Sequence, residues 1–154
     1  SSIRTLHYIK LFESFDDDNY VSKSIRDILI ELEDEGMQVD IDYHPEDFKY
    51  AFSPTLGPNY AFDEPKKTII QPYVVIEIKG KPFDGYPYKM QEEFEVSSVR
   101  DYIDTVVDFI EEIWPTYSLY FEKYDIDDSH LVDGKVLKDG KCGSLVIQIH
   151  KREI

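Results

Sequence analysis

The clearest pattern in the chain is a stripe of apolar residues with helical spacing near its middle. Positions three and four apart are apolar, as expected of a helix that buries one face. Ser97 or Ser98 is the expected start, and Pro115 ends the helix because proline has no amide hydrogen to donate. The stripe consists of Val99, Ile103, Val106, Val107, Ile110, Ile113 and Trp114.

A second helix is predicted upstream, between Ser24 and Gly36. Ser24 is the expected N-cap, and Asp27 is its capping-box partner three residues on. Gly36 is the expected C-cap, because glycine readily takes the left-handed conformation that ends a helix. The apolar positions between the caps again have helical spacing and are Ile25, Ile28, Leu29 and Leu32.

Four segments have the pattern of β-strands. Residues 37–43 and 117–124 alternate between the two sides of a strand, as in a sheet with one face in water. Residues 73–79 are rich in β-forming side chains, and a last strand is expected at 144–151.

The order helix, strand, connection, strand occurs twice, which indicates two α-β-β units. We therefore predict an α+β fold: a two-layer sandwich with two helices on one face of a mostly antiparallel four-stranded sheet. Asp133-Gly134 and Asp139-Gly140 are dipeptides typical of hairpin turns before the last strand. Residues 1–20 are interpreted as an N-terminal arm, and residues 21–154 as a single domain.

The composition agrees with one folded domain. A hydrophobic fraction of 42% in 154 residues is too high for a disordered chain. Cys142 is the only cysteine, which excludes an internal disulfide framework and favours a reducing compartment. No segment approaches the roughly 20 apolar residues that cross a bilayer, and no secretory signal is apparent. We expect an intracellular protein.

The formal net charge is −15, from 32 acidic and 17 basic residues. Such a charge repels phosphate backbones and anionic membrane surfaces, so direct binding of nucleic acid or membrane is not expected. It suits a protein partner with a basic surface. A well-solvated surface without a specific partner has the same composition and is the alternative.

Five carboxylates stand out on the downstream helix. At 100° per residue they fall within an arc of roughly 100° opposite the apolar stripe, over about 16 Å of helix axis. A row of this kind can imitate the phosphates of a nucleic-acid strand and occupy a basic groove, or it can simply face water. We call these residues the acidic ladder: Asp101, Asp104, Asp108, Glu111 and Glu112.

A second candidate surface is the connection between His44 and Tyr73, which is rich in proline and aromatic residues. Tyrosine and phenylalanine concentrate at protein interfaces, so this connection is a candidate binding patch. The alternative is that it packs over the open face of the sheet. The candidate residues are Tyr50, Phe52, Tyr60 and Phe62.

No motif for catalysis, cofactors or metals is found, and we expect a protein without enzymatic activity. The acidic segment Asp125 to Ser129 resembles the start of a calcium loop but is not followed by the glycine and glutamate that such a loop needs. Lys141 would lower the pKa of Cys142 if the thiol were exposed, whereas an inert thiol is the alternative. None of the histidines has the spacing of a metal or catalytic site: His7, His44, His130 and His150.

The segment Lys10 to Phe15 reads Lys-Leu-Phe-Glu-Ser-Phe. It resembles the Lys-x-Phe-Glu-x-Phe openings of small, acidic proteins encoded by large tailed bacteriophages, and residues 25–42 are similar to their helix, glycine and strand module. The likeness covers about a quarter of the chain. It implies a phage protein of the host cytoplasm or of the virion; in some such phages a similar segment directs proteins into the prohead.

Together these patterns favour a non-enzymatic phage accessory protein that binds another protein. An inhibitor that mimics DNA and a structural component of the virion are the alternatives. A sheet with one open face is also compatible with a homodimer.

Overall fold

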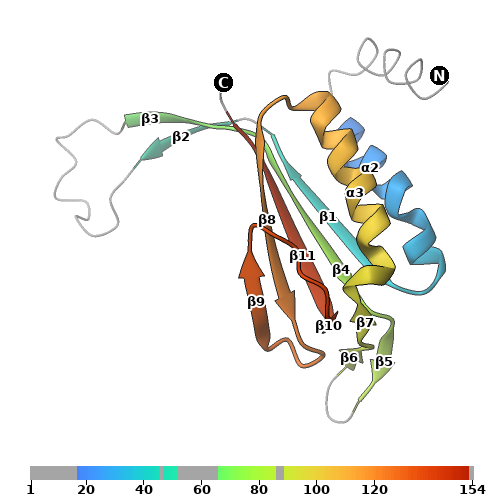
Figure 1. The fold of residues 1–154 in the computed structure, drawn as a ribbon. Helices are drawn as coiled ribbons and strands as arrows, with labels where there is room; N and C mark the ends of the chain where they lie inside the picture. The colour runs from blue at the N-terminus through green and yellow to red at the C-terminus, as the bar shows by residue number, and fades with distance from the viewer. Residues whose placement is uncertain (1–16, 46, 52–65, 86–88, 153–154) are drawn as a thin grey trace, which may run out of the picture.

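The computed structural model describes residues 17–45, 47–51, 66–85 and 89–152 (Figure 1). The Lys-x-Phe-Glu-x-Phe segment lies outside these residues. Within them, the predicted α+β sandwich is confirmed: two helices lie on one face of an antiparallel sheet. Neither helix is long and apolar enough to cross a membrane.

The sheet has five strands, one more than predicted, and every neighbouring pair is antiparallel. The four predicted strands are confirmed, and the fifth lies at an edge. Asp133-Gly134 ends this fifth strand instead of forming a hairpin turn; the turn lies earlier, where Asp128 has a φ of 65°. In spatial order the strands are β1 (Gln38–His44), β4 (Tyr73–Lys79), β11 (Ser144–Lys151), β8 (Tyr117–Tyr124) and β9 (His130–Gly134).

Helix α2 (Asp17–Asp34) begins before the predicted cap, so Ser24 lies inside it and the N-cap prediction is wrong. Tyr20 and Val21 are buried and extend the apolar stripe toward the N-terminus, which explains the earlier start. Residues 17–20, interpreted as part of an arm, belong to this helix.

The predicted C-cap of α2 is confirmed. Gly36 has a φ of +99°, a conformation that side chains other than hydrogen disfavour. Its amide donates to the carbonyl oxygen of Glu33 (2.9 Å), and the amide of Met37 donates to that of Leu32 (3.0 Å). These two bonds form a Schellman motif and direct the chain into β1.

Helix α3 (Val96–Ile113) begins before both serines that were predicted as caps. The Ser98 hydroxyl donates to the carbonyl oxygen of Glu95, and no side chain caps the helix. The amide of Val96 donates instead to the carbonyl oxygen of Gly140 (2.9 Å), so a distant loop satisfies one of the first amides. The helix ends before Pro115, as predicted.

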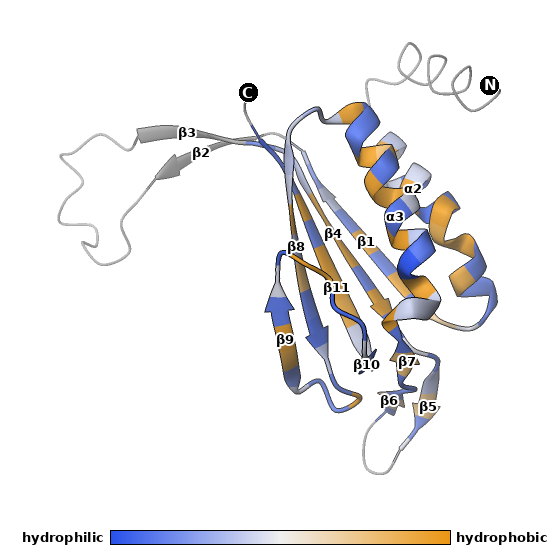
Figure 2. Cartoon of the chain, viewed as in Figure 1, coloured by the Kyte–Doolittle hydropathy of each residue, from blue (hydrophilic) through white to orange (hydrophobic). Residues whose placement is uncertain are grey.

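The core lies between the helices and the inner face of the sheet. Val106 and Ile110 are 1% and 0% exposed, and Trp114 is 4% exposed. Hydrophobic positions recur along both helices and the inner strands (Figure 2). The largest fully buried side chains include Ile25, Leu29, Leu32, Ile76, Ile78, Leu145, Ile147 and Ile149.

The predicted pattern of two α-β-β units matches the topology. One unit is α2, β1 and β4, and the other is α3, β8 and β11. Their last strands pair antiparallel at the centre of the sheet, with Ile76 opposite Ile147. The first strand of each unit lies on the outer side of the last strand of that unit: β1 lies beside β4, and β8 lies beside β11. The two helices run in opposite directions (Figure 1).

Strands β1 and β4 continue as a second ladder, β2 (Asp47–Ala51) with β3 (Lys66–Ile70). The register is the same in both ladders, which places Pro45 opposite Pro72 between them. Neither proline has an amide hydrogen for the ladder, so the pairing breaks there. The β2–β3 ribbon projects beyond the sheet (Figure 1). Of the candidate aromatic residues, Phe52, Tyr60 and Phe62 lie outside the described residues, and only the backbone of Tyr50 is described, in β2.

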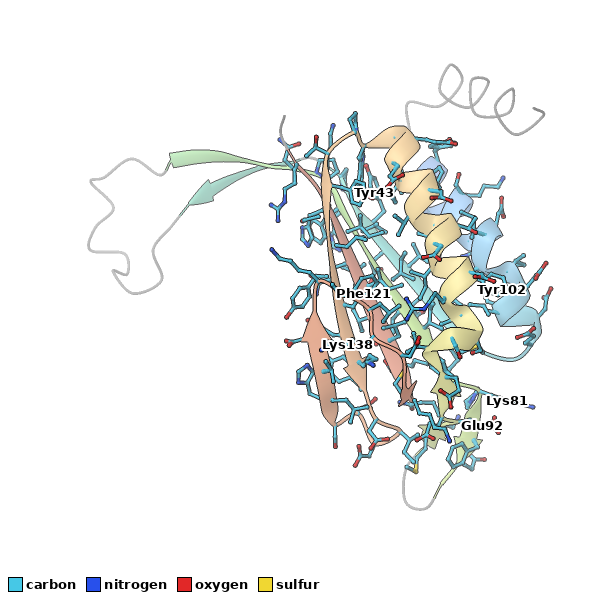
Figure 3. The ribbon with its side chains drawn as sticks, in the orientation of Figure 1. Tyr43, Lys81, Glu92, Tyr102, Phe121 and Lys138 are labelled. Atoms are coloured by element: carbon cyan, nitrogen blue, oxygen red, sulfur yellow. The ribbon has the colours of Figure 1, made fainter. Side chains whose placement is uncertain are left out.

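The opposite end of the sandwich is closed by short strands and close backbone contacts. The amide of Gly80 donates to the carbonyl oxygen of Gly143 (3.0 Å), and the amide of Glu92 donates to that of Lys81 (2.7 Å; Figure 3). A Cβ atom at Gly80 would lie 1.7 Å from the carbonyl oxygen of Glu92. The short strands are β5 (Pro82–Asp84), β6 (Lys89–Gln91), β7 (Phe94–Glu95) and β10 (Lys141–Cys142).

The side chains of Lys123 and Arg100 hold the loop between β9 and β10 at this end of the sandwich. The buried Lys123 donates from Nζ to the carbonyl oxygen of Lys138 (3.0 Å; Figure 3). Arg100 donates to the carbonyl oxygen of Leu137 and to the carboxylate of Asp139 (2.7 Å). The loop therefore lies against the start of α3, where Leu137 is buried.

The substitution Gly80→Ala is expected to lower the free energy of unfolding by roughly 3 kcal/mol, because the new methyl group clashes with a backbone oxygen that cannot rotate away. Urea unfolding followed by circular dichroism measures the change. Val136→Ala is the control, since Val136 is 75% exposed and should leave the midpoint unchanged. A Gly80→Ala midpoint equal to that of the control would contradict the close packing described for this end.

Candidate functional site

The structure places the whole acidic ladder on the solvent side of α3. All five carboxylate residues are exposed, while Val99, Ile103, Val106 and Ile110 on the opposite side are buried. Because the buried side fixes the rotation of the helix, the ladder has a fixed direction.

The charge of the ladder is largely uncompensated. In the described part of the chain, no ion pair reaches Asp101, Asp104, Asp108 or Glu112. Glu111 differs, because it accepts a hydrogen bond from the Tyr117 hydroxyl (2.6 Å). The single basic residue of α3, Arg100, binds Asp139 in the loop.

Helix α2 extends the acidic surface. Residues 21–35 carry five acidic and two basic side chains, and one of the basic ones, Arg26, pairs with Glu33 (2.9 Å). The Tyr102 hydroxyl of α3 donates to Glu31 of α2 (2.6 Å; Figure 3), which ties the two helices together without adding positive charge. The outer surface of the helix layer is therefore acidic across both helices.

The open face of the sheet carries a second cluster, which sequence reasoning missed. His44, Tyr73 and His150 lie side by side on β1, β4 and β11, and their rings are stacked. The centroids of His44 and Tyr73 are 4.3 Å apart, and those of Tyr73 and His150 are 4.9 Å apart. We call these three residues the aromatic stack.

Only the strand register brings the stack together, because its members are far apart in sequence. The sequence gives no strand register, and therefore no neighbours for His44 or His150. Burial and the nearby charge of Arg152 lower the pKa of His150.

A row of four carboxylates crosses the same face in register and is interrupted by Val146 of β11: Asp40 and Glu77 lie on one side of it, and Glu122 and Asp133 on the other. Like charges directly opposite each other destabilise a sheet, so hydrogen-bond donors or cations beside these pairs are favourable. Glu122 accepts a short hydrogen bond from the Tyr124 hydroxyl, and Asp133 accepts one from Tyr120 (2.7 Å).

The other half of this row is less well compensated. Glu77 has Lys79 at 3.6 Å, and no ion pair reaches the exposed Asp40 or Asp42 within the described ranges. These carboxylates border a shallow hollow of about 340 Å³. The hollow is lined by Arg26, Asp40, Ile41, Asp42, Val75, Glu77 and Val146.

Two carboxylates of the acidic turn after β8 accept hydrogen bonds from its own backbone, and that of Asp128 accepts from the Gln91 side chain (3.0 Å). Asp125 accepts from the amide of Ile126 (2.7 Å), and Asp127 accepts from that of Ser129 (3.0 Å). The interaction with Ser129 lowers the pKa of Asp127. Among the residues that the structure describes, no group of three histidine, cysteine or acidic side chains has the geometry of a metal site.

Cys142 is fully buried, so the basic residue beside it in sequence does not activate it. Burial raises the pKa of its thiol to about 11, although Lys123 acts in the opposite direction. The thiol therefore stays protonated near neutral pH and is a poor nucleophile.

Tyrosine hydroxyls that donate to carboxylates have raised pKa values and lose their protons at a higher pH than usual. The bond to Glu31 raises the pKa of Tyr102 to about 12, and the bond to Glu122 does the same for Tyr124. For Tyr117 burial is the larger cause and the bond to Glu111 the second, again giving a pKa of about 12. These pKa values lie above the ordinary 10.0 of tyrosine. The stability that the three protonated hydroxyls contribute to the fold is therefore present below pH 10 and is lost as the pH rises toward 12.

The variant Glu31→Gln is therefore expected to return the pKa of Tyr102 toward 10.0, since the first cause of its rise is removed. Phenolate absorbance during an alkaline titration of the folded protein measures this change. Glu112→Gln is the matched control, because Glu112 contributes to none of the raised tyrosine pKa values. Identical titrations of the two variants would show that the bond between the helices does not exist in solution.

Comparison of the chain with protein-family models, curated proteins and solved structures finds no match.

Proposed function

We propose that this protein is a non-enzymatic binding protein that docks on a basic surface of another protein through its helix layer. The observation that carries the proposal is the acidic ladder, whose charge is not neutralised by cations in the described part of the chain. Opposite charges across an interface speed association and fix its register. Rigid attachment of α3 to the core means that little ordering is needed on binding.

Reversing two ladder charges, in the variant Asp104→Lys with Asp108→Lys, should weaken binding by roughly thirtyfold, since close charge pairs across an interface are broken and replaced by repulsion. Glu111 is left unchanged because it binds Tyr117. The partner is first captured from extracts of the source organism, identified by mass spectrometry and purified. Calorimetric titration then measures its affinity for each variant.

The matched control is Asp84→Lys with Glu92→Lys, which changes net charge equally at exposed positions away from the ladder. The control should keep most of the affinity, and circular dichroism should show that both variants are folded. Equal affinity of the ladder variant and the wild-type protein would overturn the proposal.

A second candidate is an inhibitor that mimics DNA, favoured by the straight run of carboxylates over about 16 Å of helix axis. In that case the captured partner is a nucleic-acid-binding enzyme. A DNA duplex should then compete with this protein for the partner, and the competition should disappear with the ladder variant. Simultaneous binding of duplex and protein would exclude mimicry while leaving docking on a basic surface intact.

A further inference from the structure

The open face of the sheet is a surface that the proposed function does not use. Its outward residues on β4, β8 and β11 are half-buried, whereas Asp40, Asp42 and His44 on β1 are exposed. No described helix or strand packs on this face, and the β2–β3 ribbon projects beyond it (Figure 1). The face is therefore accessible along the β1 edge.

The aromatic stack offers a flat ring surface at that edge. His44 lies on the edge strand, and its one ring contact in the described part of the chain is with Tyr73. His44 is exposed, and no other described ring stacks on its imidazole, so a further planar group can stack there. Planar groups that stack well on such rings include the guanidinium of arginine.

Carboxylates lie beside the stack on the same face. Asp42 is two residues from His44 on β1 and therefore roughly 7 Å away along the strand. Asp40 follows at the same spacing, and Glu77 lies opposite Asp40. The hollow between them has Val75 and Val146 in its lining, against which the methylene groups of a long basic side chain can pack.

The stack and the carboxylates are separate features that favour the same ligand chemistry. A guanidinium can stack on a ring and donate two hydrogen bonds to a carboxylate at once, whereas an ammonium group lacks the planar shape. The basic residues of this region have partners within the chain. Arg26 pairs with Glu33 and Lys79 with Glu77. Arg152, whose charge reaches His150, donates to the hydroxyl oxygen of Ser118. The local charge is therefore complementary to a cation from outside.

The position of these groups also indicates the conformation of the ligand. β1 is an edge strand of the sheet, and its outer backbone groups have no strand partner among the described elements. Edge strands recruit extended segments by adding a further strand, with alternate side chains reaching the same face. Arginines at alternate positions of such a segment would reach the stack and the hollow.

We propose that the β1 edge and the adjoining open face bind an extended, arginine-bearing segment of a partner protein. The inference rests on the proposed function only for the basic character of the partner, since the stack and its carboxylates lie on the face of the sheet that the helix layer does not cover. Arg26 reaches the hollow from α2.

The test uses the whole ¹⁵N-labelled protein and a short synthetic peptide in which arginine alternates with threonine. Amide shifts should change along β1 and β4 and leave α3 unaffected. Replacing arginine by citrulline, which has the same shape without charge, should weaken binding by about tenfold or more, and replacing it by lysine by about threefold.

Two single substitutions that each remove one negative charge show whether peptide binding depends on the carboxylates beside the stack or only on the overall charge of the protein. Asp42→Asn should weaken peptide binding by about tenfold, and Asp104→Asn on the ladder should leave it within about twofold. His44→Ala should reduce the preference for arginine over lysine, because the ring is lost while the carboxylates remain.

Shift changes confined to α2 and α3, or equal weakening by Asp42→Asn and Asp104→Asn, would overturn the inference, since only long-range attraction would then remain. The proposed function would stand in that case, because it depends on the ladder variant and the purified partner. Conversely, the ladder variant keeps its affinity for the partner, and the arginine peptide binds at β1, if only this inference is correct. Those two results together would overturn the proposed function.

Discussion

Burial of the two apolar helix stripes against one face of the sheet is the interaction on which the rest of the structure depends. Full burial of one branched aliphatic side chain contributes roughly 1.5–3 kcal/mol, and many such residues are buried here. Repulsion between neighbouring carboxylates on a helix surface costs only a few tenths of a kcal/mol per pair, about the size of a favourable pair. The core therefore fixes the orientation of both helices, and the acidic residues take the outward positions that remain.

Tyrosine has a distinctive role in this acidic surface. The hydroxyls of Tyr102, Tyr117, Tyr120 and Tyr124 all donate to carboxylates. A phenol is a neutral donor, so it orients a carboxylate without cancelling its charge. Lysine or arginine at the same positions would neutralise the surface. The molecule thus has ordered carboxylates and still keeps a formal net charge of −15.

The sequence predicts the elements of this fold well because each has one buried face. Alternation identifies β1 and β8, β-forming side chains identify β4, helical spacing identifies α3, and Gly36 identifies the end of α2. The starts of the helices are mispredicted for a tertiary reason. At α3 the amide of Val96 is satisfied by Gly140, which no local pattern reveals.

The two candidate surfaces also differ in how much of each the sequence predicts. The outward direction of the ladder follows from helical geometry alone and is predictable from residue positions. Its lack of cation partners depends on the place of Arg100, which reaches across to the loop at Asp139. The aromatic stack requires the register of three strands, and β9 has no alternating pattern to identify it.

The place of β11 at the centre of the sheet has a consequence for how the chain folds. Residues 144–151 lie between β4 and β8 and supply hydrogen bonds to both α-β-β units. Without these residues, β4 and β8 each have an unpaired edge, and part of the apolar face of the helix layer is uncovered. Such half-sheets are the kind of intermediate that aggregates or recruits chaperones. The sandwich is therefore complete only when β11 pairs with both β4 and β8.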